Sequence, residues 1–136
     1  VGSILRTIEA LRIGTLFFGG NTPFIDNDKV QKTSMGAYGL VPCRQAPKLT
    51  ELPRPCIVLD TAPQAISLYD FIFPEVFTLV LGNEEYGVSN NSLQEADYVI
   101  EIPLPGYKNS INVAAAFAIA ASEIRRQKIF QTSREI

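Results

Sequence analysis

The sequence predicts an α/β fold in which helices cover both faces of a mostly parallel sheet. Short apolar runs of the kind that parallel sheets bury alternate along the chain with segments of helical spacing. In the last third, polar loops containing glycine follow the apolar runs, where such folds build a ligand crevice at the carboxyl ends of their strands. The 136 residues, 46% of them hydrophobic, suit one domain with its own core.

The chain is expected to begin with an amphipathic helix and a strand. Apolar residues recur at helical spacing within residues 2–11, namely Ile4, Leu5, Ile8 and Leu11. Gly14 follows as a stop signal, and residues 15–18 form a β-rich run. The polar stretch 26–33 has room for a short helix before glycines interrupt the pattern again.

The middle of the chain combines a proline-rich stretch with a buried strand. Prolines disfavour long regular elements between residues 41 and 55, so we expect one short strand there. Residues 56–59 are an apolar run of buried-strand type. Asp60 or Thr61 would then cap a helix with Pro63 in its first turn. This helix would carry Ala65, Ile66, Leu68 and Tyr69.

Two further buried strands and a closing helix are expected in the last third. The strands cover residues 77–81 and 98–102, and the helix runs from residue 110 to about residue 130. The closing helix is rich in alanine on every face. Small side chains allow close approach to a neighbouring element or a partner subunit, and high helix propensity explains them equally well.

Composition excludes several classes of function. No stretch approaches the ~20 apolar residues of a membrane span, and the amino terminus lacks a signal-peptide pattern. Without histidine, and with Cys43 and Cys56 far from metal-type spacing, no metal site is expected and a reduced, cytoplasmic setting fits best. The net charge of −2 implies that any RNA contact is local. The basic run Arg125, Arg126 and Lys128 has the ordinary explanation of a solvated helix face.

The polar segments each have an ordinary structural explanation when taken singly. Residues 82–89 read as a tight turn after a strand, and residues 102–106 as a strand ended by proline. Arg6, beside the apolar stripe of the first helix, would commonly be an exposed ion-pairing residue. Ser110 suits helix capping, whereas Asn112 falls just inside the predicted helix, where solvent exposure or a specific partner must account for it.

Taken in order, these segments resemble the three motifs of the SpoU (TrmH) family of RNA ribose 2′-O-methyltransferases, within the SPOUT superfamily. Gly2 and Arg6 match Asn-x-Gly-x-x-x-Arg, and residues 81–89 match Leu-Gly-x-Glu-x-x-Gly-hydrophobic-Ser. Residues 102–112 match hydrophobic-Pro-hydrophobic-x-Gly followed by Ser-Leu-Asn, with Ile111 in place of leucine. The resemblance covers nearly the whole chain.

The resemblance implies a deep trefoil knot near the carboxyl end that holds S-adenosylmethionine, a homodimer with its active site near the subunit interface, and a tRNA or rRNA substrate. Knots are rare exceptions to ordinary chain topology. The cofactor-binding residues that it implies are Leu59, Thr61, Gly82, Ile102, Leu104 and Ile111. The catalytic residues that it implies are Arg6, Glu84, Ser110 and Asn112. It implies no metal.

The implied reaction is in-line attack of a ribose 2′-hydroxyl on the sulfonium methyl, which requires aligned reactants and removal of a proton. The resemblance assigns Arg6 to activating the hydroxyl. Because a guanidinium stays protonated in proteins, we expect Arg6 to stabilise the developing alkoxide and to bind phosphate. Glu84, Ser110 and Asn112 would position the ribose and order the loops.

The first-motif asparagine would fall one position before Val1. Residues 1–136 are therefore expected to be a SpoU-type catalytic domain that lacks the start of motif one and any upstream RNA-binding extension. One alternative is a catalytically inactive knotted RNA-binding module. Another is an ordinary doubly wound nucleotide- or flavin-binding domain, which no Gly-x-Gly-x-x-Gly or Walker-type loop supports.

Overall fold

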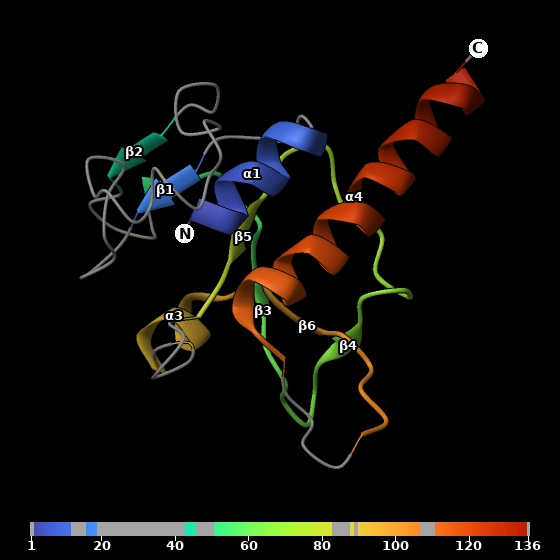
Figure 1. The fold of residues 1–136 in the computed structure, drawn as a ribbon. Coiled ribbons are helices and arrows are strands. Elements are labelled where there is room, and N and C mark those ends of the chain that lie inside the picture. Colours follow the sequence, from blue (N-terminus) through green and yellow to red (C-terminus); the bar gives the residue numbers. More distant parts are fainter. Residues whose placement is uncertain are drawn as a thin grey trace.

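The computed structural model describes residues 2–11, 16–18, 43–45, 51–82, 88, 90–106 and 111–135. Figure 1 shows the described elements, which are α1 (Gly2–Leu11), β1 (Leu16–Phe18), β2 (Cys43–Gln45), β3 (Cys56–Leu59), β4 (Ile66–Ser67), β5 (Thr78–Val80), α3 (Asn90–Glu95), β6 (Tyr98–Glu101) and α4 (Val113–Glu135). The short helix expected at residues 26–33 lies outside the described residues.

The described strands pair in parallel, as the apolar runs predict, and they form two sheets where the sequence predicted one. The larger sheet has the strand order β4-β6-β3-β5, and β1 pairs with β2 in a smaller one. Each pairing in both sheets is parallel. The central strand β3 buries Cys56, Ile57 and Val58 almost completely. The prediction of a parallel α/β sheet is therefore confirmed.

One hydrophobic core joins the larger sheet to α4. Its buried members are Ile57, Leu68, Phe71, Phe73, Ile100, Ala120 and Ile124. Full burial of an aliphatic or aromatic side chain contributes about 1.5–3 kcal/mol, so this cluster contributes a large share of the driving force. Helix α1 lies against α4 (Figure 1) and buries Ile4 and Ile8 at the predicted spacing. Helix α3 contacts β3.

One prediction for the segment after β3 is wrong. The sequence predicted a helix there, with a cap at Asp60 or Thr61 and with Ala65, Ile66, Leu68 and Tyr69 on it. Ile66 instead pairs with Ile100 in β4, and the Leu68 N–H donates to the Glu101 carbonyl at 2.8 Å. Ile66 lies on the edge strand of the sheet and is 40% exposed, whereas Leu68, just beyond β4, is fully buried in the core. The apolar spacing suited either element, and pairing with β6 supplies both burial and main-chain hydrogen bonds.

The closing helix begins later than predicted, at Val113 instead of residue 110. Asn112 is its N-cap, because its Oδ1 accepts hydrogen bonds from the main chain of Ala114 at 2.8 Å and of Ala115 at 3.3 Å. The interpretation of Asn112 as a residue inside the helix is therefore wrong. The short helix α3 was not predicted from the sequence. No helix in the described part of the chain is long and apolar enough to cross a membrane.

The start of β3 is tied to the turn before β6 by Asp97. Its Oδ2 accepts a 2.6 Å hydrogen bond from the Cys56 main chain, and it pairs with the Arg54 guanidinium at 3.1 Å. The hydrogen bond from Cys56 is the main cause that lowers the Asp97 pKa below its ordinary value of 3.8, and Arg54 adds to it. Burial raises the pKa of the Cys56 thiol, which favours its neutral form.

Candidate functional site

The carboxyl ends of three neighbouring strands meet at one edge of the larger sheet. Leu59 of β3 lies opposite Ile100 of β6, and Val58 lies opposite Val80 of β5. The Asp60 N–H continues the β3–β6 ladder by donating to the Ile100 carbonyl at 3.0 Å. Because all three strands are parallel, the segments that follow them emerge together at this edge.

Four of the predicted cofactor-binding residues lie at or just beyond these strand ends. Leu59 ends β3, Thr61 lies two residues beyond it, Gly82 lies two residues beyond β5, and Ile102 follows β6 directly. Leu59 and Ile102 are half-buried and pack against the core, whereas Thr61 is exposed. The edge therefore presents apolar side chains beside irregular main chain. Such a surface can hold a flat heterocycle through van der Waals contact while main-chain groups hydrogen-bond its rim.

The remaining two cofactor candidates lie on the connection from β6 to α4. Leu104 is half-buried, and Ile111 is 41% exposed immediately before the Asn112 cap. The first turn of α4 has its main-chain N–H groups satisfied in part by the Asn112 carboxamide oxygen. Asn112 thus has a structural role at the start of α4, in addition to any contact with a substrate.

Arg6 stands apart from these strand ends within one chain. It lies on α1 with an exposed side chain. Figure 1 shows α1 well separated from the connection between β6 and α4, which carries Ile102 and Ile111. Among the described residues, no hydrogen bond or ion pair joins Arg6 to the strand ends. Glu84 and Ser110, the other two catalytic candidates, lie outside the described residues.

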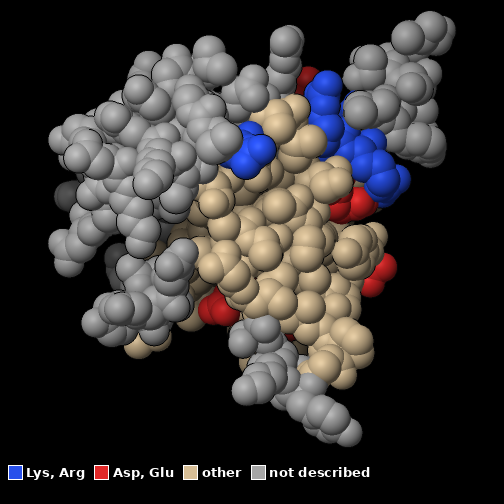
Figure 2. Space-filling view, viewed as in Figure 1, with Lys and Arg blue, Asp and Glu red and all other residues tan. Residues whose placement is uncertain are grey.

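A groove of about 500 Å³ runs between α4 and the segment that follows β4, and nothing in the sequence pattern predicted it. It is lined by Tyr69, Ala118, Ile119, Ser122, Glu123 and Arg126. Tyr69 is 58% exposed, and the neighbouring Ile72 is 78% exposed. In Figure 2, much of the described surface on the face that carries α4 is uncharged, with basic residues gathered at the upper right, acidic residues beside them and further acidic residues at the edges.

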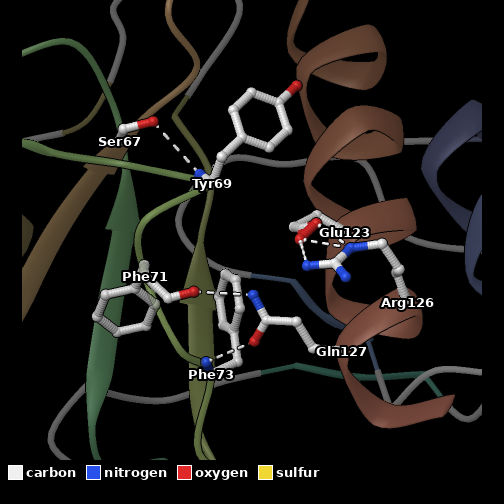
Figure 3. Close-up of polar contacts among 7 residues, drawn as sticks. All are labelled: Ser67, Tyr69, Phe71, Phe73, Glu123, Arg126 and Gln127. Atoms are coloured by element: carbon white, nitrogen blue, oxygen red, sulfur yellow. Dashed lines mark hydrogen bonds and ion pairs between the residues drawn. The ribbon is translucent and has the colours of Figure 1, made fainter. Parts of the chain in front are cut away.

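Glu123 is the buried charged residue of this region. It is 7% exposed, and its carboxylate accepts hydrogen bonds from the Arg126 guanidinium, including contacts of 2.8 and 2.9 Å from Nε (Figure 3). This pairing lowers the Glu123 pKa below its ordinary value. The pair lies within one helix at i and i+3 spacing, and the Arg126 side chain is 65% exposed whereas that of Glu123 is buried. No group of acidic or cysteine side chains in the described ranges could hold a metal ion.

Comparison with known proteins finds one family along most of the chain. The model of the SpoU rRNA Methylase family matches residues 1–122. The chain is 28% identical to a 23S rRNA (uridine(2479)-2′-O)-methyltransferase of Streptomyces viridochromogenes, covering 95% of this chain and 49% of that protein. It is 32% identical to the 23S rRNA (guanosine(2553)-2′-O)-methyltransferase RlmP of Bacillus subtilis, covering 92% of this chain and 52% of that protein.

A solved structure shares the fold. It is the SpoU methyltransferase AviRb from Streptomyces viridochromogenes in complex with the cofactor AdoMet. The TM-score is 0.83 and the sequence identity is 27%, over 95% of this chain and 55% of that one. The chain therefore spans about half the length of these relatives.

Proposed function

Because this chain belongs to the SpoU rRNA Methylase family, we propose that it transfers a methyl group from S-adenosylmethionine to a ribose 2′-hydroxyl of rRNA or tRNA. The observation that carries the proposal is the meeting of Leu59, Gly82 and Ile102 at one edge of the parallel sheet. Both rRNA relatives are named for 2′-O-methyl transfer, and the AviRb structure is a complex with AdoMet.

The cofactor would lie against the strand ends. Leu59, Ile102 and Leu104 would supply apolar walls, and Gly82, without a side chain, would let the main chain approach the ligand. Thr61 and Ile111 would close the site at the rim, where both are exposed. A deep trefoil knot, with the chain that leads into α4 passed through a loop, would bring the second and third motifs around the same ligand.

Bound S-adenosylmethionine would supply an electrophilic methyl group on its sulfonium, and residues of this chain would position and activate the ribose hydroxyl. Arg6 would stabilise the alkoxide that develops on the ribose oxygen and would bind a neighbouring phosphate. Glu84 and Ser110 would position the ribose. Asn112 would order the start of α4 through its cap, so that Ile111 stays at the rim.

A homodimer would explain how Arg6 reaches the site. Within one chain, α1 is distant from the connection that carries Ile102 and Ile111 (Figure 1). Tyr69 and Ile119 line the α4 groove with exposed apolar side chains, which favours burial of this face against a second copy. In such a dimer, α1 of one copy would lie beside the strand ends of the other. A stable interface buries about 800 Å² on each partner, which is the scale that this face must supply.

We propose that residues 1–136 form a SpoU-type catalytic domain. The choice of RNA and nucleotide would rest on the shape of double-stranded RNA and on stacking and hydrogen bonds to unpaired bases. A reducing, cytoplasmic location suits the free, buried thiol of Cys56.

The test is methyl transfer by the full-length protein with S-adenosylmethionine labelled in its methyl group. We expect label in rRNA or tRNA as an alkali-resistant 2′-O-methyl nucleotide. Arg6→Ala should abolish transfer and leave S-adenosylmethionine affinity nearly unchanged, whereas Arg125→Ala, an arginine of α4 outside the proposed site, should retain activity. RNA binding without any transfer would instead support an inactive RNA-binding module, and a large loss of cofactor affinity in Arg6→Ala would mean that its role is misassigned.

A further inference from the structure

Gln127 connects α4 to a segment that belongs to no strand. Its Nε2 donates to the Phe71 carbonyl at 2.8 Å, and its Oε1 accepts from the Phe73 N–H at 2.9 Å (Figure 3). Phe71 and Phe73 lie in the connection between β4 and β5, outside the described strands. One side-chain amide thus forms hydrogen bonds with two main-chain groups of the kind that a neighbouring strand would otherwise pair with.

The segment on the other side of these hydrogen bonds is anchored in the core. Phe71 and Phe73 are 8% and 3% exposed, and their rings meet edge to face with centroids 5.0 Å apart. Phe71 also contacts the ring of Tyr98, at the start of β6. The partner of Gln127 is therefore a fixed part of the sheet layer.

The core contacts of α4 are made by apolar side chains. Ala120 and Ala121 are fully buried, and Phe117 and Ile124 pack through apolar atoms. Close packing of these side chains restricts the helix, and the hydrogen bonds of Gln127 add directional contacts that weaken steeply when their geometry is lost. The Glu123–Arg126 pair lies within α4 and cannot set the helix against anything else.

We propose that Gln127 is a positioning residue, which fixes the height and rotation of α4 and thereby holds Ile111 and Asn112 against the strand ends. Asn112 lies about 22 Å along the helix from Gln127, at a rise of 1.5 Å per residue. A continuous helix transmits an axial shift along its length, so a change at Gln127 reaches the first turn of α4. The inference rests on the proposed function, because the cofactor site provides its readout.

The experiment compares Gln127→Met, which keeps length and volume but loses both hydrogen bonds, with Thr78→Val in the full-length protein. Thr78→Val removes one comparable hydrogen bond, which the Thr78 Oγ1 donates to the Pro53 carbonyl at 2.6 Å. Thr78 lies far from α4 along the chain. We expect both variants to fold with lowered melting temperatures. Gln127→Met should lower kcat for RNA methylation by roughly 10–100-fold and weaken S-adenosylmethionine binding, with KM for RNA unchanged. Thr78→Val should keep both values within about twofold of the wild type.

Equal kcat and cofactor affinity in Gln127→Met and the wild type would overturn the inference, and the proposed function would stand. A wild-type protein that neither binds S-adenosylmethionine nor transfers methyl groups would overturn both. Hydrogen exchange in the wild type gives an independent reading should Gln127→Met fail to fold. Because coupling is reciprocal, cofactor binding should slow exchange of the Phe73 N–H more than that of the Thr78 N–H, which donates to the Pro55 carbonyl. Equal slowing at both amides would contradict the proposal.

Discussion

Asp97 illustrates how one carboxylate sets the position of a central strand. It accepts a hydrogen bond from the first residue of β3, Cys56, and pairs with Arg54, which also donates to the Glu95 carbonyl at 3.0 Å. The ionised form of Asp97 is favoured in the folded state, since its pKa is lowered by these contacts. Its contribution to stability is therefore tied to pH.

We predict that Asp97→Asn lowers stability at neutral pH and that the difference disappears in acid. A group with a lowered folded-state pKa stabilises the fold above its unfolded pKa, about 3.9 for aspartate, and loses that effect as pH falls through the folded value. Urea unfolding at pH 7 and at steps below pH 4 measures the difference. Asp70→Asn, at an exposed aspartate, is the control. A gap between wild type and Asp97→Asn that is the same at every pH would contradict the prediction.

Asn112 shows what residue type alone leaves open. Asparagine has low helix propensity and high preference for the N-cap, so its presence marked a helix start within a few residues. The sequence could not say whether the helix began at residue 110 or at Val113, because Ser110 and Asn112 are both good caps. The hydrogen bonds to Ala114 and Ala115 settle the boundary.

Elements whose pattern has a single explanation were predictable from the sequence. Residues 2–11 fit a helix through Ile4 and Ile8, and residues 56–59 fit a buried strand through continuous apolar side chains. The segment around Ile66 fitted two patterns, and its pairing with β6 is a long-range interaction that local spacing does not contain. The same holds for Gln127, whose partners lie more than fifty residues away in the chain.

The proposed homodimer interface lies on α4. Ile119 is 37% exposed in the middle of the groove-lining face, so replacing it by glutamate should place a charge in the proposed interface. We expect the wild type to sediment as a dimer and Ile119→Glu as a folded monomer. Ile66→Glu, at an isoleucine of similar exposure on β4, should remain dimeric. A monomeric wild type, or a dimeric Ile119→Glu, would contradict the placement of the interface.

At the scale of the whole molecule, the sequence predicted a parallel sheet but neither its strand order nor the separation of α1 from the strand ends. Parallel pairing follows from the alternation of apolar runs and helices, and it brings Leu59, Gly82 and Ile102 to one edge. The packing of α1 on α4 depends on side-chain complementarity that no local pattern encodes. The proposed function followed from the resemblance carried by three motifs in order, each of which is ordinary by itself.

The central claim is that this edge of the sheet binds S-adenosylmethionine. Calorimetric titration of the full-length protein tests it most directly, with Gly82→Val as the site variant and Glu75→Gln, at an exposed residue of the β4–β5 connection, as the control. We predict saturable binding of S-adenosylmethionine and of its demethylated product by the wild type and Glu75→Gln, and loss of binding in a folded Gly82→Val protein. A folded wild-type protein that binds neither compound would contradict the account.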